Sequence, residues 1–98
     1  MVKVINAIQP YNENCPSQYS CWLDFWEKRT GKPATYCRNC GKYTTDLCGG
    51  HVQKVEQRSD GKWYRLPGLY ITPICYECNN PENSKIFNVD EKDLVRIP

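Results

Sequence analysis

The chain has 98 residues, a mean hydropathy of −0.71 and a formal net charge of +2. This length predicts a single domain over residues 1–98 with a small hydrophobic core. No apolar run approaches the ~20 residues that a membrane-spanning helix needs, so the sequence argues against a membrane protein. Because the net charge is close to neutral, the distribution of charged residues is more informative than their total.

The N-terminal third predicts a strand, a loop and a helix. Residues 2–9 alternate weakly between apolar and polar side chains and favour a short strand, and the Asn-, Pro- and Ser-rich residues 10–19 favour a loop. Ser20 can cap the N-terminus of a helix that runs to about Thr30. Two tryptophans four residues apart give this helix an apolar stripe that we expect in the core.

The C-terminal half predicts a β-hairpin and several short elements. Segments 51–57 and 63–66 are strand-like, and the Asp60-Gly61 pair between them is a strong turn signal. We expect three further elements: a β-rich run at 69–72, a short strand at 86–89 and a final turn that Asp90 caps and that ends at Leu94.

Two CxxC pairs are the strongest signal for chemistry. Cys37-Arg38-Asn39-Cys40, here called the first knuckle, and Cys75-Tyr76-Glu77-Cys78, the second knuckle, are 34 residues apart. Each pair places two thiolates on one tight turn, and four thiolates complete the tetrahedral coordination of a structural Zn²⁺. We therefore predict an α+β domain of the zinc-ribbon or treble-clef type, with the hairpin between the knuckles and one N-terminal helix. The alternative is reduced buried cysteines or a redox dithiol.

The number of cysteines bears on the compartment. Seven cysteines are an odd number, their spacing is of the metal-binding type, and the first ten residues lack the apolar core of a secretory signal. We therefore expect a reducing cytoplasm rather than a secreted disulfide scaffold.

A basic run surrounds the first knuckle. Between Lys28 and Thr45 there are five basic residues and no acidic residue. Such a run favours binding of a nucleic-acid backbone, with a protein partner as the second hypothesis. Alternatively, the basic side chains balance the negative charge of metal-bound thiolates. The five residues are Lys28, Arg29, Lys32, Arg38 and Lys42.

The order of motifs resembles that of a nuclease family. The first knuckle is followed by Gly49-Gly50-His51-Val52, and the second knuckle is followed directly by Asn79. Over about residues 37–80 this arrangement is similar to the ββα-metal nucleases (HNH or His-Me finger), most closely the recombination endonuclease VII type, and to small bacterial and phage proteins. The resemblance implies that His51 is the general base and that Asn79 helps to hold Mg²⁺.

The chain departs from that family beside the histidine. Gly50 stands where the family has an acidic or histidine metal ligand, Asp46 is the only acidic residue nearby in the sequence, and no second histidine exists. A hard divalent cation usually requires at least one carboxylate. The sequence thus leaves two hypotheses: a binding module built on structural zinc, and an endonuclease in which His51 is the base.

The remaining cysteines allow a second metal site. Cys15, Cys21, Cys48 and His51 together form a Cys₃His set, and Cys48 and His51 have CxxH spacing. The alternative is that these cysteines are small buried or loop residues. A nucleophilic role for Cys48 activated by His51 is disfavoured, because both lie on a predicted Gly-rich loop without a group to orient them.

Overall fold

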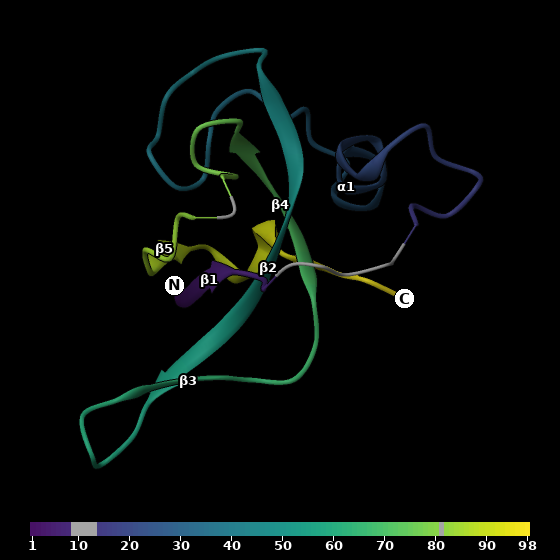
Figure 1. Cartoon of the computed structure of the whole chain (residues 1–98). Coiled ribbons are helices and arrows are strands. Elements are labelled where there is room, and N and C mark those ends of the chain that lie inside the picture. The colour runs from purple at the N-terminus through teal and green to yellow at the C-terminus, as the bar shows by residue number, and fades with distance from the viewer. Residues whose placement is uncertain (9–13, 81) are drawn as a thin grey trace.

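The computed structural model describes residues 1–8, 14–80 and 82–98. Within these ranges the chain forms one α-helix, one 3₁₀ turn and six strands of an antiparallel sheet, which confirms the α+β class. Figure 1 shows the helix beside the sheet. The elements are β1 (Val2–Asn6), α1 (Trp22–Thr30), β2 (Leu47–Gln57), β3 (Trp63–Arg65), β4 (Tyr70–Cys75), β5 (Phe87–Val89), η1 (Glu91–Asp93) and β6 (Val95–Arg96).

Strand β2 is the central element of the sheet. The strand order is β5-β1-β2-β4-β6, and β3 pairs with the C-terminal end of β2. The N-terminal half of β2 pairs with β4 in the register Leu47↔Cys75 to Val52↔Tyr70. Beyond Lys54, β2 pairs with β3 alone, so this hairpin projects from the rest of the sheet (Figure 1). The pairing brings the start of β2 to the second knuckle.

The predicted hairpin is confirmed, but its first strand begins earlier than predicted. The turn contains Gly61 at φ 81°, as the Asp-Gly signal indicates. The first strand starts at Leu47 and not at His51, because Gly49 and Gly50 continue the strand instead of forming a loop. A Cβ at Gly49 would lie 2.7 Å from backbone atoms of Trp22 and Leu23. Close approach of α1 explains glycine within this strand.

Helix α1 begins one residue later than predicted. Its N-cap is Cys21, whose Sγ accepts a hydrogen bond from the Asp24 N–H at 3.4 Å. Ser20, the predicted cap, instead donates its backbone N–H to the Asp24 carboxylate at 3.1 Å. A thiol in the extended N-cap conformation thus takes the place of the expected hydroxyl. The predicted C-terminus is confirmed by Gly31, which is left-handed at φ 72°.

The core has two clusters, one on each side of the central strands. Phe25 and Trp26 of α1 pack with Ile71 of β4 in one cluster, and all three are fully buried. The other cluster contains Val4, Val52, Ile74 and other apolar side chains together with two knuckle cysteines. The apolar stripe of the helix is therefore partly core, as predicted: Trp26 is buried and Trp22 is half-buried. Cys37 and Cys75 therefore belong to the same packed interior as the sheet, whereas Cys40 is exposed.

The other predicted elements differ mainly in length. The first strand ends at Asn6 instead of residue 9, and the strand predicted at 69–72 extends to Cys75. The predicted loop holds over residues 14–19, whereas its residues 10–13 lie outside the described part of the chain. The turn after Asp90 is confirmed, and β6 was not predicted. No helix within the described ranges is long and apolar enough to cross a membrane.

Candidate metal centre

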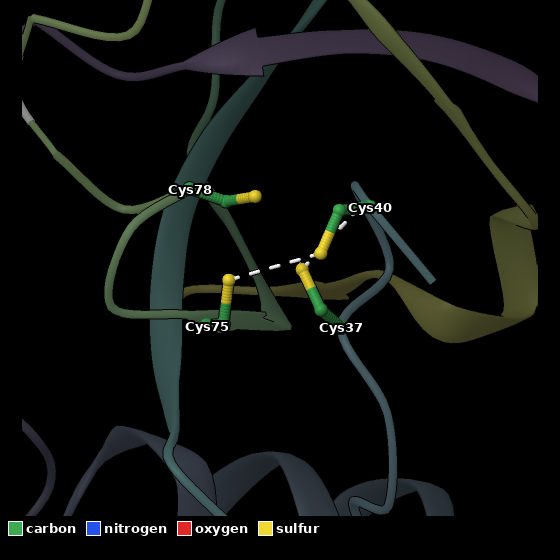
Figure 2. A group of neighbouring side chains, drawn as sticks. All are labelled: Cys37, Cys40, Cys75 and Cys78. Carbon is green, nitrogen blue, oxygen red and sulfur yellow. Dashed lines mark hydrogen bonds between the residues drawn. The ribbon is translucent and has the colours of Figure 1, made fainter. Parts of the chain in front are cut away.

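Four cysteine sulfurs from the two knuckles converge on one point. The first knuckle lies on the loop between α1 and β2, and the second begins at the last residue of β4. In Figure 2 the four side chains point toward one another from these two segments. All four sulfurs lie within 4.8 Å of one another, and the Cys40 Sγ to Cys75 Sγ distance is 3.8 Å. The cysteines predicted as metal ligands are therefore brought together as a set.

The two knuckles share a local geometry. In each, the backbone N–H of the residue after the second cysteine donates to the carbonyl of the first cysteine, from Gly41 to Cys37 and from Asn79 to Cys75, both at 2.9 Å. Gly41 has φ 80°, which explains glycine at this turn. The N–H groups of Asn39 and Cys40 approach the Cys37 sulfur at 3.4 Å. Such turns aim two sulfurs in the same direction.

Backbone donors favour ionisation of the Cys37 thiol. Burial acts to raise its pKa, but hydrogen bonds from the N–H groups of Cys40, Cys75 and Asn39 outweigh burial and lower the pKa to about 7. A thiol must lose its proton to bind a metal, so this lowered pKa assists binding near neutral pH.

The spacing of the four sulfurs is compatible with a tetrahedral metal ion. Four thiolates at about 2.3 Å from one Zn²⁺ place neighbouring sulfurs about 3.8 Å apart. The 3.8 Å separation of Cys40 and Cys75 matches that spacing. Thiolates select soft or borderline ions over Mg²⁺ and Ca²⁺. The cluster can therefore hold a metal ion such as zinc, with all four coordination positions taken by the protein.

Hydrogen bonds join the first knuckle to the sheet and to its own loop. The Arg38 N–H donates to the Pro73 carbonyl of β4 at 2.9 Å, and Cys37 N–H donates to the Lys42 carbonyl at 2.9 Å. The rings of Tyr36 and Tyr43 lie 5.2 Å apart across this loop. These contacts hold the first knuckle beside β4, the strand that ends in the second knuckle.

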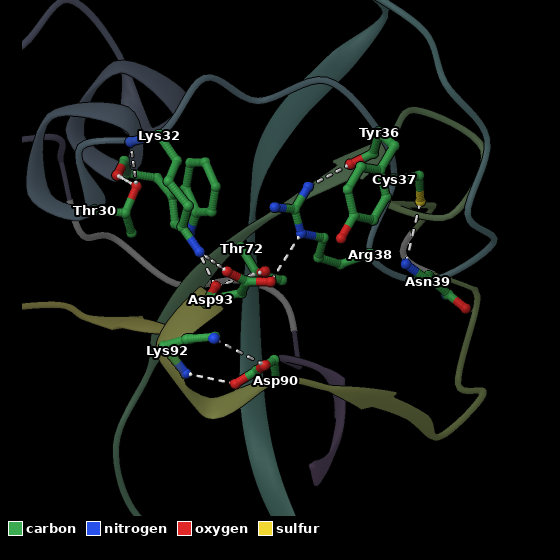
Figure 3. A network of polar contacts seen from close by, with 11 residues as sticks. Thr30, Lys32, Tyr36, Cys37, Arg38, Asn39, Thr72, Asp90, Lys92 and Asp93 are labelled. Atoms are coloured by element: carbon green, nitrogen blue, oxygen red, sulfur yellow. Dashed lines mark hydrogen bonds and ion pairs between the residues drawn. The ribbon is translucent and has the colours of Figure 1, made fainter.

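Asp93 is the centre of a buried polar network. Its carboxylate accepts from Lys32 and, at 3.3 Å, from Arg38. Its backbone carbonyl accepts from Trp26 Nε1 and from Thr72 Oγ1, both at 2.9 Å. Figure 3 shows Lys32 and Arg38 converging on Asp93. The network therefore joins η1 to the helix, to β4 and to the first knuckle.

Arg38 is part of the interior rather than of a binding surface. Its side chain is 6% exposed, and its guanidinium lies 3.9 Å from the Tyr36 ring centre and 5.1 Å from that of Trp26. Lys32 is paired with the same Asp93, and Lys28 is paired with Asp24 at 2.7 Å. Arg38 is therefore not a surface cation as the basic run suggests. Lys28 and Lys32 remain exposed beside their carboxylates, and the nucleic-acid hypothesis stays a prediction for them.

His51 and Asn79 lie on opposite faces of β2. His51 is buried, and its ring meets that of Trp22 edge to face at 5.3 Å, on the side of α1. The Asn79 side-chain oxygen lies 3.3 Å from the position of a Cβ at Gly50, the neighbouring residue. Successive residues of a strand point to opposite faces. The two residues that the nuclease resemblance pairs are therefore separated by the strand.

The proposed second metal site is not assembled. Cys15, Cys21, Cys48 and His51 are all described, and within the described ranges the knuckle cysteines form the only set of three or more candidate ligands. Cys48 lies in β2, where its thiol donates to the Ile74 carbonyl at 3.2 Å. Burial and the charges of Cys75 and Cys37 raise its pKa to about 11, which opposes a nucleophilic role. The predicted Gly-rich loop for Cys48 and His51 is wrong, because both belong to a strand.

One residue of the site carried no signal in the sequence. Asp93 lies 55 residues from Arg38 and follows two other acidic residues, Asp90 and Glu91, so nothing in the local sequence singles it out as the one that is buried.

Comparison of the chain with protein-family models, with curated proteins and with solved structures finds no match. The resemblance to the His-Me finger nucleases therefore remains a prediction from the motifs alone.

Proposed function

We propose that this chain is a small binding module stabilised by one structural zinc ion, of the zinc-ribbon or treble-clef type. The observation that carries the proposal is the convergence of four thiols within 4.8 Å from segments far apart in the sequence. Bound zinc supplies a cross-link between the first knuckle and β4, and the four thiolates leave it no open position for catalysis. A reducing compartment such as the cytoplasm keeps these thiols available.

The charge of the loaded protein favours a protein partner over nucleic acid. Four thiolates and one Zn²⁺ together carry two negative charges, which cancel the formal +2 of the chain. Lys32, Arg38 and Lys28 are already paired with carboxylates, which leaves Arg29 and Lys42 from the basic run. Nucleic-acid affinity depends on several cationic contacts to phosphates. A module of zero net charge whose basic run is largely paired with its own carboxylates suits a protein partner better.

The geometry does not favour the endonuclease alternative. His51 and Asn79 are directed to different faces of β2, and a Cβ at Gly50 would meet Ile74 at 2.2 Å, so no ligand side chain fits there without rearrangement. A Mg²⁺ site requires oxygen ligands in near-octahedral geometry, usually with at least one carboxylate, and Asn79 alone offers a single neutral oxygen. The binding module is therefore the function that we propose.

Native mass spectrometry of the purified chain tests the zinc centre. We expect one zinc per chain, lost in Cys75→Ser and retained in Cys21→Ser, because Cys21 is exposed and outside the cluster. A preparation without zinc that keeps its fold, or equal zinc loss in both variants, would contradict the proposal. Two zinc ions per chain would reinstate a second site.

A further inference from the structure

Two hollows lie next to each other at the knuckles, and Tyr76 lines both. The larger, about 300 Å³, lies between the N-terminus of α1, the start of β2 and the second knuckle. The smaller, about 120 Å³, lies between the loop after the first knuckle and the second knuckle. The Tyr76 side chain is 64% exposed. An exposed aromatic residue between two hollows is typical of the centre of a protein interface.

The larger hollow is apolar. Its walls include Trp22, Leu23, Leu47 and Tyr76, with the Cys48 thiol beside them. Its volume is at the lower limit of ligand pockets in general, which suits one large side chain better than a whole cofactor. The Cys48 thiol is already engaged with the Ile74 carbonyl, so it offers little to a polar ligand. This hollow therefore selects an apolar anchor.

The smaller hollow is acidic when the metal centre is loaded. Its walls include the carboxylates of Asp46 and Glu77 and one cation, Lys42. Cys75, one of the four clustered cysteines, also lines it, so a thiolate-bound zinc would add its negative charge at the wall of this hollow. Two carboxylates and a doubly negative metal centre outweigh one lysine. This hollow therefore attracts a cationic group and repels phosphate.

We propose that these two hollows bind a peptide segment of a partner protein in which a Lys or Arg side chain neighbours a large apolar one. The apolar side chain occupies the larger hollow, the basic side chain reaches Asp46 and Glu77, and Tyr76 packs between them. The inference rests on the proposed function, because the zinc centre supplies part of the negative charge. It adds the location of the binding surface and the chemistry of the partner.

Selection from a random peptide display library on the zinc-loaded full chain tests this inference. We expect the selected peptides to combine a basic residue with an adjacent large apolar residue. Affinity for a synthesised peptide should fall about tenfold or more in Tyr76→Ser and in the Asp46→Asn, Glu77→Gln double variant. Raising the salt concentration should weaken binding to the wild type more than to the double variant.

Matched controls lie on the hairpin away from the knuckles. Trp63→Ser removes another exposed aromatic side chain and Glu56→Gln another exposed carboxylate, and both should leave the affinity unchanged. Zinc content is measured for every variant, so that lost metal is distinguished from lost binding. Asp46 lies outside both knuckles. If Tyr76→Ser releases zinc, loss of peptide affinity in zinc-loaded Asp46→Asn alone still tests the inference.

Three outcomes would overturn the inference while leaving the zinc centre intact. These are one zinc per chain with no peptide enriched, enriched peptides without basic residues, and tighter binding of a single-stranded oligonucleotide that depends on Tyr76. A chain without zinc would instead reject the proposed function itself.

Discussion

Gly49 and Gly50 decide how closely α1 and the Ile74 side chain approach β2. A Cβ at Gly49 would meet the backbone of α1 at 2.7 Å, and a Cβ at Gly50 would meet Ile74 Cδ1 at 2.2 Å and Cγ1 at 2.5 Å. Glycine at these two adjacent positions thus serves opposite faces of β2, one against the helix and one against the core. Neither role involves an unusual backbone angle, since neither residue has a positive φ.

Substitution of Gly50 by alanine is therefore expected to lower the free energy of unfolding by about 1–3 kcal/mol through overpacking. Ile74→Val removes the Cδ1 atom that lies nearest to the new methyl group. The Gly50→Ala, Ile74→Val double variant should therefore be more stable than the sum of the two single effects on the free energy of unfolding indicates. Gly49→Ala should cost more than Gly50→Ala, because backbone atoms of α1 cannot rotate away. Urea unfolding at saturating zinc measures all four variants. If the changes in free energy of unfolding caused by Gly50→Ala and Ile74→Val simply add in the double variant, the close contact between these two residues is contradicted.

At the scale of elements, Asp93 joins the C-terminal segment to the rest of the fold. The η1 turn contributes a carboxylate to Lys32 and Arg38 and a carbonyl to α1 and β4. The side chain of Asp93 is 10% exposed and that of Arg38 is 6% exposed. A buried pair of this kind is weak evidence of net stabilisation, but removal of one partner leaves the other charge buried and uncompensated.

We expect Asp93→Asn to lower the free energy of unfolding by about 3 kcal/mol, because Arg38 loses its buried counter-charge. Glu56→Gln, which removes an exposed ion pair with Arg58, should have a small effect. Denaturant unfolding of the wild type and both variants at pH 7 and saturating zinc measures the difference. Similar effects of the two substitutions would show that the Asp93 network contributes no more than a surface pair.

The pH dependence of that difference follows from the pKa of Asp93. Burial acts to raise this pKa, but the hydrogen bond from Lys32 and the charges of Arg38 and Lys32 lower it below its ordinary value of 3.8. A carboxyl with a lowered folded-state pKa stabilises the fold above its unfolded-state pKa and loses that contribution as pH falls through the folded value. The difference between wild type and Asp93→Asn should thus be constant from pH 8 to pH 5. A decrease within this range would contradict the lowered pKa.

Local signals in the sequence predicted much of the fold. The CxxC spacing, the Asp60-Gly61 turn and the glycine at the end of α1 each act over a few residues, and the corresponding features are present. Long-range packing was not predictable in the same way. The Gly49-Gly50 pair was read as a loop because nothing local indicates that α1 and Ile74 approach there. The burial of Arg38 depends on Asp93, which is remote in the sequence.

At the scale of the whole molecule, each of the two knuckles contributes one cysteine to the same core cluster. Cys37 and Cys75 are buried with Val4, Val52 and Ile74 in one cluster. Loss of the metal would leave several thiols, and at neutral pH some thiolate charge, within this cluster. A core of this size has little surplus stability, and binding of a structural zinc contributes on the order of 10 kcal/mol in comparable small domains.

Removal of zinc by EDTA is therefore expected to abolish the near-UV circular dichroism of the buried aromatic residues, and Cys75→Ser should do the same without chelation. Readdition of zinc should restore the signal of the wild type and not that of Cys75→Ser. Cys21→Ser is the matched control, since its thiol is exposed and outside the cluster. A near-UV spectrum that is unchanged by EDTA after zinc has been lost would show that the fold does not depend on the metal.

The arrangement of the whole molecule also bears on catalysis. Metal-dependent hydrolysis of a phosphodiester requires a base and a positioned cation that both reach the same scissile phosphate. His51 is buried against Trp22 on the helix side of β2, whereas Asn79 lies on the other side next to Gly50. A thiolate-bound zinc with four protein ligands offers no position for water or phosphate. Lys and Arg alone would have to neutralise the developing charge.

We therefore expect no metal-dependent cleavage of plasmid or branched DNA by the wild type with Mg²⁺ or Mn²⁺, and no difference between the wild type and His51→Ala. Because His51 is buried, zinc content and near-UV circular dichroism are recorded for the variant, so that misfolding is not mistaken for lost activity. Trp63→Ser provides a folded comparison with an altered surface remote from His51. Cleavage by the wild type and by Trp63→Ser that disappears in a folded, zinc-loaded His51→Ala variant would instead establish an endonuclease. In that case β2 would have to rearrange when DNA binds, since the base and Asn79 lie on opposite faces of the strand.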